Sequence, residues 1–502
     1  MVTRVFSRFL FPPIQNAALG AAVSFYFLFY MSSALVITVL LILLVTLCFF
    51  RVLNSVNIQP RLSQPVSLRA AALLIGVLAG ICAANDGYNK VNFGIPENNV
   101  LAIEGVLLED PRIVSGGSVM ASVSLRKSTG KDVRVSSRGD ITVFFPAESA
   151  AKLKEFGRGV TIYAEGTLSS SERRYLSFFQ SNSNNAQDWT FSAKSLHIVH
   201  TAPVIEKTRT GIRQSLINRF EGKPWGGLSI ALLLGVRENL DADFTSMYRN
   251  AGLSYILALS GMHLAILAAL IAFILKKPLG LKVSAVTGSV IILLYCFLVG
   301  PMPSLNRSAL MYILGVAAII FALPKNALSI LSLSFLMQII ITPAAGNSIS
   351  FILSYIALFG ILVVGKALYS LFAGKVPDFL LQPLSVSGGA FLATAGVCGF
   401  YFGTIAPVGI IAGLIIIPLT AIFMIGSILW LVLDIFSLSV LLDIPLSILY
   451  KLMESTASFA GNVPGISASS TVILVFSISL MLLIITLEYR RRTVLLQLKP
   501  FL

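Results

Sequence analysis

Charged residues are scarce in this sequence. They make up 12% of its 502 residues, whereas 56% are hydrophobic. A soluble protein of this length needs far more charge to cover its surface. Apolar runs of about 20 residues, long enough to cross roughly 30 Å of hydrocarbon, recur along most of the chain. The composition therefore excludes an ordinary soluble protein and predicts a polytopic α-helical membrane protein.

Histidine and cysteine are scarce as well. Three histidines cannot supply a multi-histidine metal cluster, and two of them, His197 and His200, share one strand-like stretch. The four cysteines lie in apolar segments without CxxC spacing, which argues against disulfides and a thiolate metal site. HExxH, Walker A and GxSxG motifs are also missing. We therefore expect no enzyme, no cofactor and no metal, and transport must be driven from elsewhere.

The formal net charge of +15 is spread unevenly. Residues 85–210 hold 15 Lys/Arg and 13 Asp/Glu, a net of +2, so +13 belongs to the remainder of the chain. The positive-inside rule predicts basic loops on the cytoplasmic side. Arg4, Arg8 and the later basic loops therefore place both termini in the cytoplasm and residue 85 onward outside.

Apolar segments predict about twelve transmembrane helices. Three lie in residues 1–84 and nine in residues 253–490, ahead of a short tail at 491–502. The segments run near 14–31, 33–50, 69–84, 253–275, 281–299, 303–323, 327–342, 346–365, 386–402, 405–432, 441–460 and 469–487.

A different pattern fills residues 85–203. The stretches "LAIEGVLL", "VMASVSLR", "DITVFF", "VTIYAEGTL" and "WTFSAKSLHIV" alternate, or nearly alternate, apolar and polar residues. A helix-like stretch, "ESAAKLKEF" (148–156), falls between the third and the fourth. Five strands with a helix at that place are typical of a small OB-type barrel. We expect a soluble OB-like β domain inserted after the third helix.

Residues 204–252 join these parts. "VIEKTRTGIRQSLINRFEGKP" is polar and basic with helically spaced apolar residues, which predicts a helix at the membrane surface. The following "WGGLSIALLLGVRENL" is too short to cross, so we expect it to be buried or re-entrant. Arg237, Glu238 and Arg249 lie in the charged stretch 235–252, either as a solvated loop that pairs its own charges or as part of a transport path.

His263 stands out in the apolar stretch "YILALSGMHLAILAALIAFILKK" (255–277). It lies roughly 15 Å along its predicted helix, near the midplane. Ionisable residues inside a membrane usually face the bundle interior or a watery path. The alternative is a neutral histidine bonded to a neighbouring carbonyl. Ser260 and Gly261 allow a close backbone approach, or a helix break that lets backbone line a cavity.

Arg307 stands out in "GPMPSLNRSALM" (300–311), about one turn into a predicted helix that includes Ser304. An arginine there either lies on an anion path or snorkels to the interface.

The β domain carries a group of cations within thirteen residues, together with several aromatic side chains. Single-strand binders on OB folds combine a basic groove with aromatic platforms, although aromatics in a barrel are often core residues. The cations are Arg126, Lys127, Lys131, Arg134 and Arg138, and the aromatics are Tyr163, Tyr175, Phe178, Phe179 and Trp189.

These stretches, in order, resemble the ComEC-type competence proteins, inner-membrane channels for DNA uptake. The stretch from "ALLLG" to "SGMHLAIL" resembles the family's histidine signature. "PSLNRSALM" resembles its "S-x-x-R-A-x-x-M", and "SFILSYIALFGI" (350–361) its "G-F-Q-L-S-F-x-A". "YFGTIAPVGIIAGLIIIPLT" (401–420) resembles the segment with "N-x-x-x-x-P". The resemblance covers about residues 20–490.

Some positions depart from that family pattern. Tyr255 stands where the family usually has its first histidine, Ile352 replaces a glutamine, and Gly413 or a neighbour replaces an asparagine. The sequence resembles the short members, which lack a C-terminal metallo-β-lactamase-like domain, so we expect any nuclease to be a separate protein.

The resemblance implies a bacterial inner-membrane channel that passes single-stranded DNA into the cytoplasm during natural transformation, with the OB-like domain receiving it. Implied partners are membrane lipids, a periplasmic DNA-receptor protein, a cytoplasmic helicase and a separate nuclease. A secondary transporter or flippase for a small anionic or lipid-linked substrate remains an alternative, as does an assembly scaffold. The expected path residues are Ser260, Gly261, His263, Ser304, Arg307, Arg237, Glu238 and Arg249.

Overall fold

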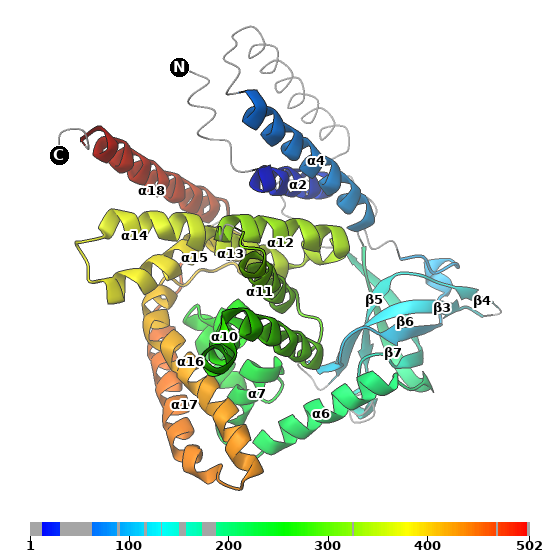
Figure 1. The fold of residues 1–502 in the computed structure, drawn as a ribbon. Coiled ribbons are helices and arrows are strands. Elements are labelled where there is room, and N and C mark those ends of the chain that lie inside the picture. Colours follow the sequence, from blue (N-terminus) through cyan, green and yellow to red (C-terminus); the bar gives the residue numbers. More distant parts are fainter. Residues whose placement is uncertain are drawn as a thin grey trace. The chain divides into compact units, whose positions relative to one another are not determined.

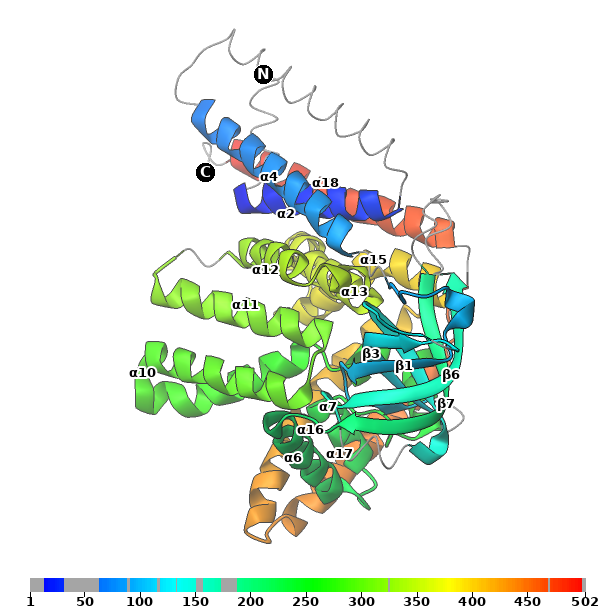
Figure 2. The same cartoon turned by 90° about the vertical axis from the view of Figure 1, so that its right-hand side faces the viewer.

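The structure is a computed structural model, drawn as a ribbon in two views (Figures 1 and 2). It divides into two compact units, Met1–Gln214 with Ser332–Ser348, and Ser215–Leu331 with Ile349–Leu502. The structure describes residues 13–30, 63–87, 91–114, 118–131, 133–149, 157–172, 187–323, 326–467 and 470–498.

The first unit contains a seven-stranded sheet. Its order is β1-β6-β7-β5-β3-β2, with β4 on β3 and a further pairing between β1 and β3. The β5–β7 pair is parallel and the others are antiparallel. The strands are β1 (Ala102–Leu107), β2 (Arg112–Ile113), β3 (Val119–Thr129), β4 (Arg134–Ser136), β5 (Asp140–Phe145), β6 (Thr161–Glu172) and β7 (Gln187–His200).

The alternation that predicted β1, β3, β5, β6 and β7 also builds the core of the sheet, whereas the short strands β2 and β4 were not predicted. Val119, Ala121, Val123 and Leu125 of β3 are buried, because alternate side chains of a strand face one side. They pack in one cluster with apolar residues of β1, β5, β6 and β7. The predicted β structure in this region is therefore confirmed. Of the expected helix at 148–156, only its first residues are described, within the 3₁₀ turn η2 (Ala147–Ser149).

Two apolar helices of the first unit, α2 (Pro13–Tyr30) and α4 (Ser63–Gly87), pack closely. A Cβ on Gly76 would collide with the backbone of Ala17, so glycine allows this approach. Tyr26 donates its hydroxyl hydrogen to the Gly346 carbonyl at 3.0 Å. Gly346 lies in η3 (Pro343–Asn347), next to α12 (Ala327–Ile341). The predicted segment 33–50 lies outside the described residues.

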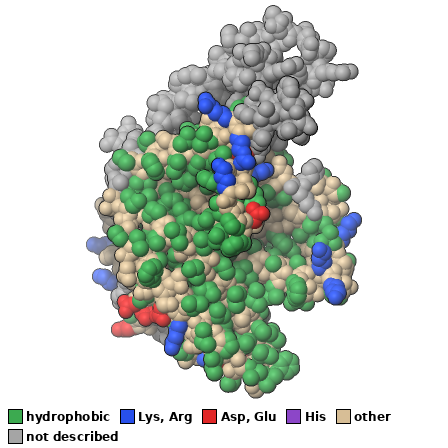
Figure 3. Space-filling view, turned by 90° about the vertical axis from the view of Figure 1, so that its left-hand side faces the viewer, with side chains coloured by type: hydrophobic (Ala, Val, Ile, Leu, Met, Phe, Trp, Pro, Cys, Tyr) green, Lys and Arg blue, Asp and Glu red, His purple; other side chains and the backbone are tan. Residues whose placement is uncertain are grey.

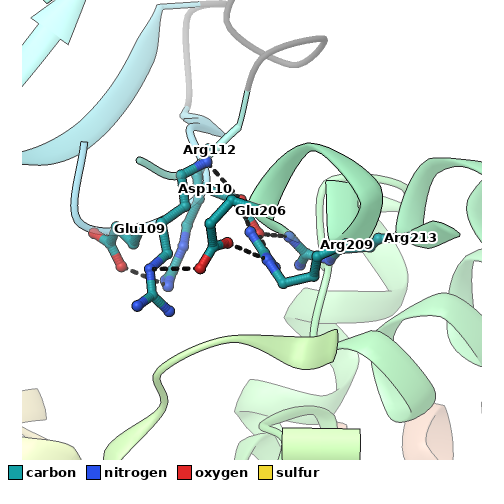
Figure 4. A network of polar contacts seen from close by, with 7 residues as sticks. Glu109, Asp110, Arg112, Glu206, Arg209 and Arg213 are labelled. Atoms are coloured by element: carbon teal, nitrogen blue, oxygen red, sulfur yellow. Dashed lines mark hydrogen bonds and ion pairs between the residues drawn. The ribbon is translucent and has the colours of Figure 1, made fainter. Parts of the chain in front are cut away.

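An ion-pair network fixes the start of α6 (Val204–Phe220) to the loop after β1 (Figure 4). Arg209 is 1% exposed and donates to both carboxylate oxygens of Asp110, at 3.0 and 2.5 Å. Arg213 also pairs with Asp110, and Glu206 accepts from Arg209 Nε at 2.7 Å. Burial raises the pKa of Asp110, but Arg209 and Arg213 lower it more, so it lies below the ordinary value of 3.8.

The second unit holds the end of α6 and most of the other helices. Beyond α6 and α12 these are α7 (Gly226–Leu234), α8 (Ala242–Asn250), α9 (Ser254–Leu257), α10 (Gly261–Val299), α11 (Pro303–Ile320), α13 (Ile349–Gly360), the π-helix η4 (Ile361–Gly365), α14 (Lys366–Phe372), α15 (Asp378–Phe402), α16 (Val408–Ile435), α17 (Val440–Gly461) and α18 (Ser470–Leu498).

Within the described residues, six helical segments are long and apolar enough to cross a membrane. They are Gly261–Val299, Pro303–Ile320, Ile349–Phe372, Asp378–Phe402, Val408–Ile435 and Val472–Arg491. Helix α16 illustrates the apolar surface of these segments. Its Ile411, Ile415 and Ile422 are more than half exposed, while Ile416 and Phe423 are buried. Figure 3 shows hydrophobic side chains over most of one face. A membrane protein is thus supported, and the remaining predicted spans stay predictions.

Helix α10 folds back on itself. Gly280 breaks it with φ 74°, a left-handed value that glycine adopts without strain, and Pro278 lies just before. Ile271 of the first half contacts the position where a Cβ on Gly288 of the second half would lie. The two halves share one buried cluster. The predicted segments 253–275 and 281–299 are therefore joined by this reversal.

Helix α7 is almost entirely buried, as expected for "WGGLSIALLL". It follows an aromatic cluster in which Trp225 lies 5.4 Å from Trp430 and 6.3 Å from Phe423, centroid to centroid. Asp443 of α17 links this cluster to the segment before α7, because it accepts hydrogen bonds from Trp430 Nε1 at 2.8 Å and from Lys223 Nζ at 2.6 Å. These contacts form the rigid core against which α10 begins.

Candidate functional site

The helix that carries His263 begins later than its sequence predicts. The short helix α9 ends at Leu257, Ala258 is extended, and α10 starts at Gly261 with Ser260 as its N-cap. His263 therefore lies in the first turn of α10, not about ten residues into a helix, and the expected 15 Å offset is wrong. Of the two alternatives for Ser260 and Gly261, the structure shows a break in the helix, which lies at residues 258–260.

His263 closes this turn with its own ring. It is fully buried, and its Nδ1 accepts a hydrogen bond from the Ser260 amide at 3.1 Å. The Ser260 hydroxyl lies 3.0 Å from the same nitrogen. Because an amide can only donate, Nδ1 carries no proton and the proton of the neutral ring is on Nε2. Nε2 is buried and has no hydrogen-bond partner within the described residues.

Arg307 of α11 lies beside the first residue of α10. A Cβ on Gly261 would be 3.2 Å from Arg307 Nη2 and 2.6 Å from the hydroxyl of Ser308. Arg307 is 7% exposed, and its guanidinium lies over the ring of Tyr355, 5.6 Å from the centroid. This arrangement differs from a snorkelling arginine, whose head reaches water. It brings Gly261 and Arg307, both predicted path residues, into direct proximity.

Apart from the Tyr355 ring, the contacts of Arg307 are weak. Its Nη1 reaches only the Met311 sulfur, at 3.8 Å, and its Nε has no hydrogen-bond partner in the described part of the chain. The same part of the chain offers it no ion pair. A buried cation without a counter-charge costs several kcal/mol. Arg307 is therefore a buried cation whose charge is not balanced by an ion pair within the described residues.

Ser304 lies one turn before Arg307 on the same helix. Its hydroxyl is 3.2 Å from that of Ser354 on α13, and its carbonyl accepts from the Ser308 hydroxyl at 2.9 Å. Ser304 thus links α11 to α13, the helix that also supplies Tyr355. The segments that place Gly261, Ser304 and Arg307 are α10, α11 and α13 of the second unit.

The charged stretch 235–252 lies on the surface of the unit. Arg237 and Arg249 are exposed, and Glu238 is partly buried. Asp241 caps α8 by accepting from the Asp243 amide at 3.2 Å. This cap is not an ion pair, so both interpretations of the stretch, a solvated loop that pairs its own charges and a part of the path formed by Arg237, Glu238 and Arg249, stay predictions.

In the β domain, one acidic residue pairs with two of the five predicted cations. Glu104, 7% exposed, pairs with Arg134 and lies 4.0 Å from Lys127. The other three, Arg126, Lys131 and Arg138, are exposed, and no ion pair is found for them within the described residues. Trp189 packs edge-on against Phe93, and Tyr163 lies on β6. Tyr175, Phe178 and Phe179 lie outside the described residues.

Comparison with known proteins places these features in one family. The sequence model of the competence protein family matches residues 232–492, more than half of the chain, and this match includes His263 and Arg307. The chain belongs to the competence protein family.

One relative of this competence protein is an uncharacterized protein of Aquifex aeolicus (strain VF5). The two are 25% identical over 264 residues, which cover 51% of this chain and 61% of the relative. The chain thus matches about three-fifths of that curated relative's length. No solved structure matches the chain significantly.

Sequence reasoning missed two parts of this arrangement. Tyr355 was not singled out, although it stands in the stretch "SFILSYIALFGI", and a tyrosine there gave no signal of its distant partner Arg307. The Asp110 network was also missed. Arg209 and Arg213 at i and i+4 on a predicted helix were the available signal, since this spacing puts both on one face.

Proposed function

We propose that this competence protein passes single-stranded DNA through the bacterial inner membrane into the cytoplasm during natural transformation. The observation that carries the proposal is the family match over residues 232–492. The buried Arg307 and the interrupted helix before α10 support it. A polyanion needs a path on which cations compensate phosphates without trapping them.

The β domain receives the DNA outside the membrane in this proposal, and both termini lie in the cytoplasm. Its strand pairing supports an OB-like barrel, because β1 pairs with both β6 and β3 and the path of paired strands returns to its start. The parallel β5–β7 pair supports the same arrangement. Exposed Arg126, Lys131 and Arg138 are the cations that meet phosphates.

The protein acts as a channel and not as an enzyme in this proposal. Movement of the strand is driven by a cytoplasmic helicase, a separate nuclease degrades the other strand, and a periplasmic receptor delivers the DNA. Groups of three or more potential metal ligands are not found within the described residues, and the proposal needs none.

The test is uptake of fluorescent single-stranded DNA into sealed vesicles that carry the full-length protein, with and without a cytoplasmic helicase and ATP inside. Nuclease added outside removes strands that have not entered. We expect protected single strands, and no protected duplex of equal length. Vesicles that take up a small anion but no DNA, with the motor present, would instead favour a secondary transporter, which an interrupted helix also suits.

A further inference from the structure

The first turn of α10 carries positive charge that nothing in the described residues balances. A helix N-terminus has free amide N–H groups and the equivalent of about half a positive charge. The amides of His263 and Leu264 already donate to the Ser260 carbonyl, so the turn is closed at Ser260. The amides of Gly261 and Met262 have no hydrogen-bond acceptor in the described chain.

Arg307 adds a full positive charge at this same helix end. Its Nη2 lies 3.2 Å from the point that a Cβ on Gly261 would occupy. A cation beside a helix N-terminus is unfavourable, and burial strengthens the repulsion because the surroundings screen it less. Arg307 is nonetheless only 7% exposed, and its Nε has no hydrogen-bond acceptor within the described residues.

We propose that the N-terminus of α10 and Arg307 together bind the phosphate group of a phosphodiester. A phosphate supplies the acceptors for the amides of Gly261 and Met262 and the negative charge that Arg307 lacks. This inference rests on the proposed function, because the phosphodiester of a DNA strand is one source of the group. The headgroup of a phospholipid is the other source with the same chemistry.

Gly261 is required in this site for a steric reason. Any side chain there would meet the hydroxyl of Ser308 at 2.6 Å and Arg307 Nη2 at 3.2 Å, so the hydroxyl would have to shift and the guanidinium would have to give by a few tenths of an ångström. Tyr355 supports the guanidinium from one face and leaves its edge for hydrogen bonds.

His263 is a positioning residue for this site. Its ring accepts from the Ser260 amide and thereby shapes the turn that presents the amides of Gly261 and Met262. A glutamine at this position keeps an acceptor that reaches the same amide, whereas alanine does not.

The experiment is calorimetric titration of inorganic phosphate into the full-length protein in a phosphate-free detergent, with sulfate as competitor. We expect binding that Arg307→Ala weakens by roughly tenfold to a hundredfold, since a charge-assisted bond is lost. Gly261→Ala should weaken binding while the arginine is retained. The matched control is Lys282→Ala, which removes an exposed cation from the second half of the same helix and should leave binding unchanged.

Several outcomes would overturn the site. One is a wild-type protein that binds no phosphate, and another is binding equal in Arg307→Ala, Gly261→Ala and Lys282→Ala. Because Arg307→Ala leaves a buried space, tryptophan fluorescence and gel filtration confirm that each variant folds, and Gly261→Ala remains as a second test. His263→Gln should keep phosphate binding near wild type and His263→Ala should weaken it, and equal loss in both would remove the positioning role.

Two further titrations identify the source of the phosphate. A short thymidine oligonucleotide that binds and is displaced by phosphate assigns the site to DNA, whereas short-chain phosphatidylglycerol that competes in its place assigns it to lipid. Arg307-dependent phosphate binding without vesicle uptake of DNA would leave this site standing and reject the channel. If instead the protein takes up DNA into vesicles but binds no phosphate, the channel stands and the phosphate site is rejected.

Discussion

Tyr248 shows how a single buried hydroxyl affects this fold. Its ring stacks on Phe244, 4.7 Å between centroids, and Phe244 stacks in turn on Tyr450 at 5.2 Å. The Tyr248 side chain is fully buried, and its hydroxyl has no hydrogen-bond partner within the described residues. Burial raises the pKa of Tyr248, with smaller contributions from Tyr450 and Glu454, so the hydroxyl stays protonated at any working pH.

Removing that hydroxyl should not harm the protein. We expect Tyr248→Phe to be neutral or to raise the free energy of unfolding by about 1 kcal/mol, because a buried polar atom without a partner disappears. Phe244→Ala should lower it by about 3–5 kcal/mol through a cavity. Thermal unfolding of the full chain in detergent, followed by tryptophan fluorescence, compares the two. A clear loss in Tyr248→Phe would mean that the hydroxyl has an acceptor after all.

At the scale of elements, glycines decide how closely helices approach. A Cβ on Gly389 of α15 would lie 2.6 Å from the Gly365 amide nitrogen and 2.8 Å from the Gly360 carbonyl oxygen. Both neighbours are backbone atoms at the ends of η4, so they cannot swing away. The π-helical turn and the close approach of α15 therefore depend on one another.

Gly389→Ala should therefore destabilise the bundle by about 1–3 kcal/mol, the usual cost of overpacking. Gly315→Ala is the matched control, since a Cβ there meets nothing within 4 Å and alanine favours the helix. Thermal unfolding of both variants in one detergent measures the difference. Equal melting temperatures would contradict the close packing.

The anchoring of α6 gives a pH dependence with a defined sign. Because the pKa of Asp110 is lower in the folded protein than its ordinary value of 3.8, its ionised form stabilises the fold. That contribution is complete above the unfolded value and is lost as the pH falls through the lower folded one. Hydrogen exchange of the α6 amides in full-length protein should accordingly rise below pH of about 4.

Asp110→Asn should show that fast exchange already at neutral pH, with a loss of about 3 kcal/mol, because the buried Arg209 would lose one of the two carboxylates with which it pairs. Glu109→Gln is the control, since Glu109 pairs with the half-exposed Arg112. Unchanged exchange in Asp110→Asn, or an equal effect in both variants, would reject the anchor.

At the scale of the whole molecule, DNA association should depend on which cations of the β domain are already paired. We expect the triple change Arg126→Ala, Lys131→Ala, Arg138→Ala to weaken binding of single strands and to reduce the salt slope by up to about 2, near 0.7 per contact. The double change Lys127→Ala, Arg134→Ala should do less, because both cations already pair with Glu104, which offsets one of their two charges. Fluorescence anisotropy at several salt concentrations distinguishes the variants, and equal slopes would place DNA elsewhere.

The sequence predicted local features well and distant contacts poorly. Alternation located β1, β3, β5, β6 and β7 because the period of two follows from strand geometry, and it missed β2 and β4, which are too short to show it. Apolar length located helices such as α11 and α16. The start of α10 was misplaced because "YILALSGMHL" is apolar throughout, and hydropathy does not register a break at Ala258. The pairing of Arg307 with Tyr355 depends on how α11 and α13 pack, which no short stretch encodes.

The reversal at Gly280 also determines when the phosphate site can form during synthesis. Because the two halves of α10 lie against each other, Leu259 and Val299 share one buried cluster with Leu305 of the next helix. Gly261 and Arg307 both precede Tyr355 in the chain, so the contact between them needs no residue that is made later. The start of α10 and Arg307 can come together while the residues after Arg307 are still being synthesised. Tyr355 then packs against a guanidinium that is already in place.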